Sequence, residues 1–176
     1  MKARSRNKVP KLDLDAIDVK ILTQLQEDAS LSNVELAQRV GLSPSPCLAR
    51  VRALEASGII ARRVTLLDPV SLGATISVFI QVALEKQTEA QLEIFEEAIL
   101  GFSEVMECYL MTGDSDYLLR VVVPDLIALQ HFIVEKVSKT PGVANIRSSF
   151  ALKQVKYKTA LPVSDLLGSA GEQTRR

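Results

Sequence analysis

The sequence predicts an α+β protein that combines an N-terminal helix-turn-helix with a C-terminal four-stranded antiparallel sheet. Three observations predict this fold. Residues 33–54 fit two short helices joined by a tight turn, and residues 75–152 alternate between strand-like and helical spacing in the order βαββαβ. The charge is segregated, because residues 1–65 carry 11 Lys and Arg against 7 Asp and Glu, whereas residues 66–176 carry 10 against 14. A positive first part fits a domain that meets phosphate.

Capping signals divide the first part into three short helices. The signals are Asp13 or Asp15 for the first helix, which ends near Asp28, the capping box of Ser32 and Glu35 for the second, and Ser43 with Pro44 for the third. Ala37 lets the last two helices approach closely, and Gly41 ends the second helix in a left-handed conformation. This spacing is typical of a helix-turn-helix, whose second helix lies in a DNA major groove. An ordinary αα-hairpin is the alternative.

The third helix is expected to turn one face to the core and another to DNA. The residues expected to point inward are Cys47, Leu48, Val51 and Leu54. The candidates for DNA contact are Ser43, Ser45, Pro46, Ala49, Arg50 and Arg52, followed after the helix by Arg62 and Arg63 as a small wing. Arg50 is expected to face the groove, and Arg52, about 200° around the helix, to meet a flanking phosphate. Solvated arginines on a helix surface are the alternative.

Composition divides the chain into five segments. We expect a basic flexible tail at 1–11, the helix-turn-helix domain at 12–65, a hinge at 66–73, the βαββαβ domain at 74–162 and a flexible tail at 163–176. In the second domain the expected strands are 75–84, 104–111, 117–123 and 143–152, and the expected helices are 88–100 and 125–137. Both helices are expected on one face of the sheet. The other face is expected to hold a partner subunit on Phe79, Val105, Leu119 and Val121.

Several classes of protein are disfavoured. No apolar run approaches the roughly 18 residues that span a bilayer, and no signal region follows the charged N-terminus, so we expect a cytoplasmic protein. Cys47 and Cys108 fall in different domains and are expected to be apolar core residues without a disulfide. The lone His131 argues against a zinc site, and no metal or cofactor is expected. The chain is not expected to be an enzyme, because it has no Gly-rich phosphate loop.

Together these residues resemble the leucine-responsive and asparagine-responsive (Lrp/AsnC) family of transcription regulators. The motifs that carry the resemblance are L-D-x-x-D-x-x-I-L-x-x-L-Q at 14–26, N-V-E-L-A-x-R-V-G-L-S-P-S-P-C-L at 33–48, E-C-Y-L-M-T-G-D-S-D-Y-L-L-R at 107–120, P-G-V at 141–143 and S-S-F-A-L-K-Q-V-K-Y-K-T-A-L-P at 148–162. The resemblance implies a winged DNA-binding module and a ferredoxin-like ligand module that dimerises through its sheet, often assembling to an octamer. It also implies a nucleoid-associated bacterial regulator of amino-acid metabolism that binds double-stranded DNA and a small amino acid.

The family pattern places the amino-acid pocket on the turn between the second and third strands and on the last strand. By this resemblance its residues are Met111, Thr112, Gly113, Asp114, Ser115, Asp116, Tyr117, Ser148, Ser149 and Phe150. A free amino acid needs an acceptor for its ammonium and N–H donors for its carboxylate, and Asp114 and the backbone around Gly113 offer both. The apolar neighbours Leu110, Met111 and Phe150 favour a hydrophobic effector such as leucine. An ordinary hairpin connection is the alternative.

Two further functions are weighed against a ligand-responsive DNA-binding regulator. One is an amino-acid-sensing oligomeric scaffold without DNA recognition, and the other, a distant third, is an enzyme on a ferredoxin-like domain. The intact start of the third helix at Ser43 and Pro44 argues against the scaffold. The acids of residues 89–97 fit a solvated helix face, which argues against the enzyme.

Overall fold

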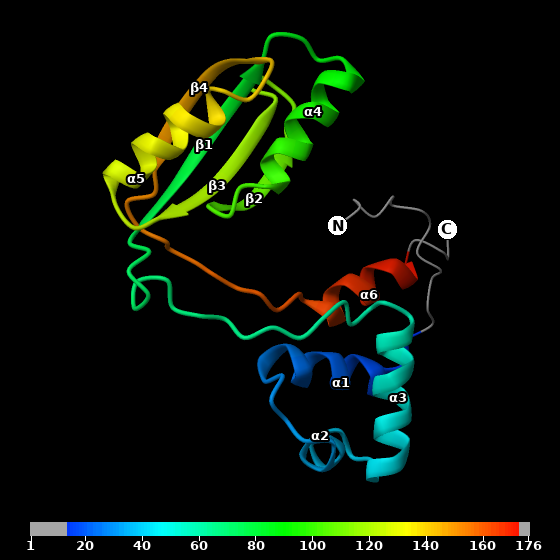
Figure 1. The fold of residues 1–176 in the computed structure, drawn as a ribbon. Coiled ribbons are helices and arrows are strands. Elements are labelled where there is room, and N and C mark those ends of the chain that lie inside the picture. Colours follow the sequence, from blue (N-terminus) through cyan, green and yellow to red (C-terminus); the bar gives the residue numbers. More distant parts are fainter. Residues whose placement is uncertain (1–13, 173–176) are drawn as a thin grey trace. The chain divides into compact units, whose positions relative to one another are not determined.

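The protein consists of two compact units in a computed structural model that describes residues 14–172 (Figure 1). Within these residues, unit 1 contains 14–65 and 156–172, and unit 2 runs from Leu66 to Val155. The first boundary coincides with the start of the expected hinge. The expected basic tail at 1–11 lies outside the described residues.

Unit 1 holds four helices within the described residues. They are α1 (Ala16–Glu27), α2 (Asn33–Val40), α3 (Pro44–Ala56) and α6 (Val163–Glu172) (Figure 1). The capping box of Ser32 and Glu35 forms as predicted, with both reciprocal hydrogen bonds present. Gly41 ends α2 at a φ of 76°, in the left-handed region that favours glycine. Local capping chemistry therefore sets both ends of α2, whereas the side chain of Ser43, the N-cap of α3, makes no capping hydrogen bond.

The core of unit 1 gathers one stripe from each of the first three helices. Its buried residues are Ile21, Leu22, Leu36, Ala37, Val40, Cys47, Val51 and Leu54. The expectation that Leu48 points inward is wrong, because 36% of this residue is exposed. The stripe of Cys47, Val51 and Leu54 uses the inward face of α3, and Leu48 lies about 100° away from Cys47 around the helix.

The C-terminal segment departs from the expected domain boundaries. A flexible tail is expected at 163–176, but residues 163–172 form α6, which packs against α1. Val163 is partly buried against the core of unit 1. Residues 156–162, expected in the second domain, belong to unit 1. The chain thus returns to the helix-turn-helix unit after it leaves the sheet.

Unit 2 is a four-stranded sheet with its helices on one face (Figure 1). Its strands are β1 (Ile76–Leu84), β2 (Val105–Leu110), β3 (Tyr117–Val123) and β4 (Val143–Phe150). Its helices are α4 (Glu89–Leu100) and α5 (Leu126–His131), which continues as a π-helix (Phe132–Val137). The strand order is β2-β3-β1-β4, and each neighbouring pair is antiparallel. This is the βαββαβ arrangement that the sequence predicts.

The two faces of the sheet are separated by the alternation of side chains along each strand. Val78, Ile80 and Val82 of β1 are fully buried against the helices. The expectation that Val105, Leu119 and Val121 supply the uncovered face is wrong, because Val105 packs against this core and Leu119 and Val121 are fully buried in it. Their register explains this, because they pair with Ile80 and Val78 and share that face.

The uncovered side of the sheet is called the open face below. Phe79 lies on it, 36% exposed, between Arg120 of β3 and Ser149 of β4. Glu107 of β2 accepts a hydrogen bond from Arg120 Nε at 2.8 Å and another from the Tyr109 hydroxyl at 2.9 Å. The open face is therefore a mixed apolar and polar surface.

The two cysteines have different environments. Cys47 is buried in the core of unit 1, as expected. The expectation of a core position is wrong for Cys108, which lies exposed on β2 at the edge of the sheet. Both thiols are free.

Candidate nucleic-acid interface and ligand cavity

The exposed side of α3 begins at its N-terminus. Ser43, the N-cap, and the predicted contact residues Ser45, Pro46, Ala49 and Arg52 are all exposed. Small side chains at the start of a recognition helix allow it to enter the major groove, and Arg52 adds a positive charge about two turns later. Asn33 of α2 holds this end, because its Nδ2 donates to the Pro44 carbonyl at 2.8 Å.

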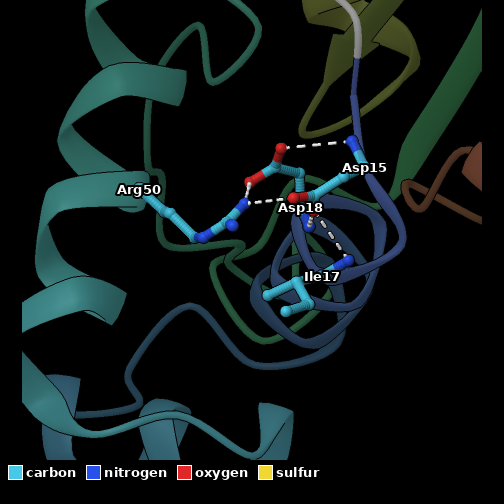
Figure 2. Close-up of polar contacts among 4 residues, drawn as sticks. All are labelled: Asp15, Ile17, Asp18 and Arg50. Carbon is cyan, nitrogen blue, oxygen red and sulfur yellow. Dashed lines mark hydrogen bonds and ion pairs between the residues drawn. The ribbon is translucent and has the colours of Figure 1, made fainter.

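Arg50 differs from the other predicted contact residues of α3, because its side chain is already bound within the protein (Figure 2). Its Nη1 donates to Asp15 Oδ2 at 2.7 Å and to Asp18 Oδ1 at 2.8 Å. The side chain of Asp18 is 15% exposed and that of Arg50 is 33% exposed. These two carboxylates raise the pKa of Arg50, Asp18 more than Asp15. The structure thus places Arg50 against α1 and does not leave it free for a groove.

The carboxylates that bind Arg50 belong to the first turn of α1. Asp15 is the N-cap, and its Oδ1 accepts from the N–H groups of Ile17 at 2.8 Å and Asp18 at 2.9 Å. The Asp18 carboxylate accepts from the Asp15 N–H at 3.3 Å, which completes a capping box. The Asp18 N–H is the main cause of a lowered pKa at Asp15, and Arg50 is the next.

The two arginines after α3 have different surroundings. Arg63 forms an ion pair with Glu55 at 2.9 Å, and both side chains are exposed to solvent. No ion pair holds Arg52 or Arg62 among the residues that the structure describes. Residues 61–68 have no regular secondary structure. In the part of the chain that the structure describes, Arg52 on α3 and Arg62 after it are therefore cations without an ion pair.

Unit 2 contains a cavity of about 220 Å³ at the β2–β3 turn. Its lining residues are Gln81 and Ala83 of β1, Met111, Thr112, Asp114 and Ser115 of the turn, and Asn145 and Arg147 of β4. Gln81 pairs with Arg147 and Ala83 with Asn145 across the β1–β4 ladder. The turn from one edge of the sheet and the last strand from the other therefore meet at one site.

The cavity combines opposite charges with a small volume. Asp114 offers a carboxylate, Arg147 a guanidinium, and Gln81, Thr112 and Asn145 offer neutral polar groups. Pockets for drug-sized ligands usually measure about 300–1,000 Å³, so this cavity suits a smaller molecule. A carboxylate and a guanidinium together can bind a zwitterion.

Asp116 and Tyr117, predicted for this pocket, have other roles. The buried carboxylate of Asp116 accepts from the Leu84 N–H at 2.7 Å and from Gln87 Nε2 at 2.6 Å. Tyr117 is 1% exposed, stacks on Phe95 with ring centroids 4.4 Å apart, and donates to Glu96 at 2.9 Å. Burial, followed by the contact with Glu96, raises the pKa of Tyr117. Both side chains support the fold around the turn.

The remaining predicted pocket residues lie beside the cavity. Gly113 has a φ of 119° and shapes the turn that carries Asp114. Ser148, Ser149 and Phe150 are exposed at the end of β4 and are not among the cavity-lining residues. Gln81, Ala83, Asn145 and Arg147 were not predicted. Their i, i+2 spacing puts each pair on one face of a strand, but only the strand order shows that β1 and β4 are neighbours.

Membrane-spanning helices and metal-binding clusters are both absent from the described residues. Among residues 14–172, no helix combines the length and apolar character that crossing a membrane requires. The same residues contain no cluster of three or more His, Cys, Asp or Glu side chains arranged to hold a metal ion.

Two family descriptions match the two units. The Lrp/AsnC ligand binding domain matches residues 77–161, and a winged helix-turn-helix DNA-binding domain matches residues 14–61. The first match covers the sheet and the segment that follows it. The second covers α1 to α3.

Curated relatives and solved structures resemble almost the whole chain. The Bkd operon transcriptional regulator of Pseudomonas aeruginosa is 50% identical over 151 residues, which are 86% of this chain and 99% of the relative. The leucine-responsive regulatory protein of Escherichia coli is 42% identical over 156 residues, 89% and 95% of the two chains. A Neisseria meningitidis transcriptional regulator in complex with L-Met has a TM-score of 0.83 at 40% identity, with 87% of this chain and 99% of that chain covered. E. coli AsnC has a TM-score of 0.73 at 26% identity, with 83% and 97% covered.

Proposed function

Because the chain belongs to the Lrp/AsnC family of DNA-binding transcriptional regulators, we propose that a small amino acid controls its action by binding in the cavity of unit 2. The observation that carries this proposal is the pair of opposite charges, Asp114 and Arg147, in the lining of one small cavity. Asp114 receives the ammonium of the amino acid, and Arg147 receives its carboxylate. The backbone N–H groups around Gly113 join Arg147 as further donors to this carboxylate.

The proposed effector has a hydrophobic side chain. Met111 and Ala83 supply the apolar part of the cavity lining, and the volume of about 220 Å³ suits one small ligand. Leucine or another branched-chain or hydrophobic amino acid fits this lining. One relative is named a leucine-responsive regulatory protein, and the crystal structure of another related regulator is a complex with L-Met.

The proposed DNA contacts start from the exposed end of α3. Ser45, Pro46 and Ala49 enter the major groove, with Ser43 at the helix start. Arg52, Arg62 and Arg63 contact flanking phosphates and set the affinity for double-stranded DNA. The sequence-specific part of recognition then rests on small side chains.

The proposed assembly is a homodimer that associates further, up to an octamer, in the cytoplasm on the nucleoid. The open face carries the first partner subunit, since Phe79 and Tyr109 are exposed on it. A ligand that bridges two dimers stabilises one arrangement of dimers and thereby changes the spacing of the recognition helices. No contact between ligand and DNA is required.

A thermal-shift screen against the twenty amino acids, with light scattering on the same samples, tests the proposal. We expect a small hydrophobic set to raise the unfolding temperature and change the mass of the assembly. Asp114→Ala and Arg147→Gln should lose this response but still bind DNA when no amino acid is present. Glu97→Gln and Lys153→Gln change charge outside the cavity and should keep the response. A full response in Asp114→Ala, or none in the wild type with any of the twenty, would contradict the proposal.

A further inference from the structure

We propose that Arg50 is a positioning residue, which fixes the recognition helix α3 against the N-terminus of α1 and makes no contact with DNA. The inference rests on the DNA-binding function above. A single nitrogen, Nη1, bridges Asp15 at 2.7 Å and Asp18 at 2.8 Å, so the arginine spans two helices (Figure 2). The acids lie 35 and 32 residues before Arg50 in the sequence.

The two acidic partners of Arg50 are also held by hydrogen bonds of their own. Asp15 and Asp18 form a reciprocal capping box that fixes the first turn of α1. The N-terminus of a helix repels a cation through the helix dipole, so an arginine binds there only through such carboxylates. Arg50 therefore binds a rigid pair of acceptors, and its rotamer is fixed by two bonds instead of one.

Among the described residues, the bridge is one of two side-chain polar contacts that join α3 to α1 and α2. At the start of the helix, Asn33 of α2 donates to the Pro44 carbonyl at 2.8 Å. Arg50, six residues later, binds α1. Between these points the helix rests on apolar side chains such as Cys47. Apolar packing is not directional. The two polar contacts therefore limit how far α3, with its exposed residues Ser45 and Pro46, can tilt.

Charge argues against a phosphate contact for Arg50. To reach a phosphate, its guanidinium must leave two carboxylates, one of them only 15% exposed. Those carboxylates then repel the approaching phosphate. Arg52 lies about 200° around the helix and is exposed without an ion pair among the described residues, so it provides the phosphate contact on α3.

The salt dependence of DNA binding separates the two roles. The probe is the intergenic DNA next to the protein's own gene, and the dissociation constant is measured at several salt concentrations. Arg52→Gln, the matched control, should lower the slope of log K against log salt by about 0.9, because one phosphate contact is lost. Arg50→Gln should weaken binding by about tenfold at every salt concentration and leave the slope unchanged. Arg50→Lys should restore the affinity, since one ammonium can bridge both acids.

Substitution of the acidic partners of Arg50 gives a second test. Its expected effect on DNA affinity is opposite to that of removing any other negative charge. Removing a negative charge from a DNA-binding unit ordinarily strengthens DNA binding, and Glu27→Gln should do so slightly. Asp18→Asn should instead weaken binding, because α3 loses its support. Stronger binding by Asp18→Asn, or a slope change in Arg50→Gln equal to that in Arg52→Gln, would overturn the inference.

Hydrogen exchange tests the role of Arg50 in the absence of DNA, and cooperative unfolding shows whether the variant still folds. Arg50→Gln should increase hydrogen exchange at the Ile17 and Asp18 amides while the cooperative unfolding of the protein persists; unchanged exchange would overturn the inference. If wild type and every variant fail to retain DNA, the DNA-binding function fails. The exchange experiment still decides whether Arg50 holds α1.

Discussion

The side-chain amide of Gln26 forms two hydrogen bonds with the backbone of Leu161. Gln26 Nε2 donates to the Leu161 carbonyl at 3.2 Å, and Gln26 Oε1 accepts from the Leu161 N–H at 2.7 Å. The two groups are 135 residues apart in the sequence. They fix the segment that leaves the sheet onto α1, just before Val163 packs against the core of unit 1.

Gln26→Ala is expected to loosen this attachment. It removes two neutral hydrogen bonds, each worth about 1 kcal/mol, so the free energy of unfolding of unit 1 should fall by about 1–2 kcal/mol. Hydrogen exchange at the Leu161 amide should increase most. Gln38→Ala, on the exposed side of α2, is the control. Equal effects of the two substitutions would contradict this role.

Asp116→Ala is expected to destabilise unit 2. It leaves the buried Leu84 N–H without its acceptor. The free energy of unfolding, measured with urea, should therefore fall by about 1–3 kcal/mol. The neighbouring exposed residue provides the control, because Asp114→Ala should leave stability almost unchanged and remove the amino-acid response. If Asp114→Ala costs as much stability as Asp116→Ala, the division between a supporting and a binding carboxylate is wrong.

Gly142→Ala is expected to cost more stability than Gly73→Ala. Both glycines have a positive φ, 83° and 79°, and this strain costs about 1–2 kcal/mol in each case. A Cβ at Gly142 would also lie 1.9 Å from Gln91 Nε2, which donates to the Pro141 carbonyl, whereas a Cβ at Gly73 meets nothing within 4 Å. Calorimetry of both variants measures the difference. Adding Gln91→Ala to Gly142→Ala should remove it; persistence of the difference would rule out the clash.

The stability of unit 1 is expected to depend on Glu35 at acidic pH. The Ser32 hydroxyl, followed by the Ser32 N–H, lowers the pKa of Glu35. A carboxyl whose pKa is lower in the folded state stabilises the protein above its unfolded pKa, about 4.3 for glutamate. That contribution is lost as the pH falls through the lowered folded pKa. Glu35→Gln should flatten this part of the pH profile in thermal unfolding, and Glu27→Gln, the control, should not.

The features that the sequence predicts correctly are those whose determining contacts are local. The capping box of Ser32 and Glu35 joins residues three positions apart, and Gly41 acts through its own backbone. The alternation of Val78, Ile80 and Val82 likewise needs only the period of a strand. Such features predicted the helix-turn-helix and the βαββαβ order, because neighbours in the chain decide them.

The tertiary structure alone decided the positions of side chains whose partners lie far away in the sequence. Arg50 has the same local signal as Arg52, a cation on the exposed side of a recognition helix. The carboxylates of Asp15 and Asp18, more than 30 residues earlier in the sequence, bind Arg50 and hold it against α1. Tyr117 belongs to the same motif as Asp114, but the side of β3 on which it lies sends it into the core. Arg147 joins the cavity only because β4 pairs with β1.

The sequence by itself thus determined α1 to α3 and the order of the strands and helices of unit 2, since caps, turns and periodicities act over a few residues, and its motifs indicated the family. The pairing of strands and helices decided which side chains meet. Charge complementarity and burial act between groups that the fold brings together, so the partners of Arg50 and the lining of the cavity exist only in the folded chain.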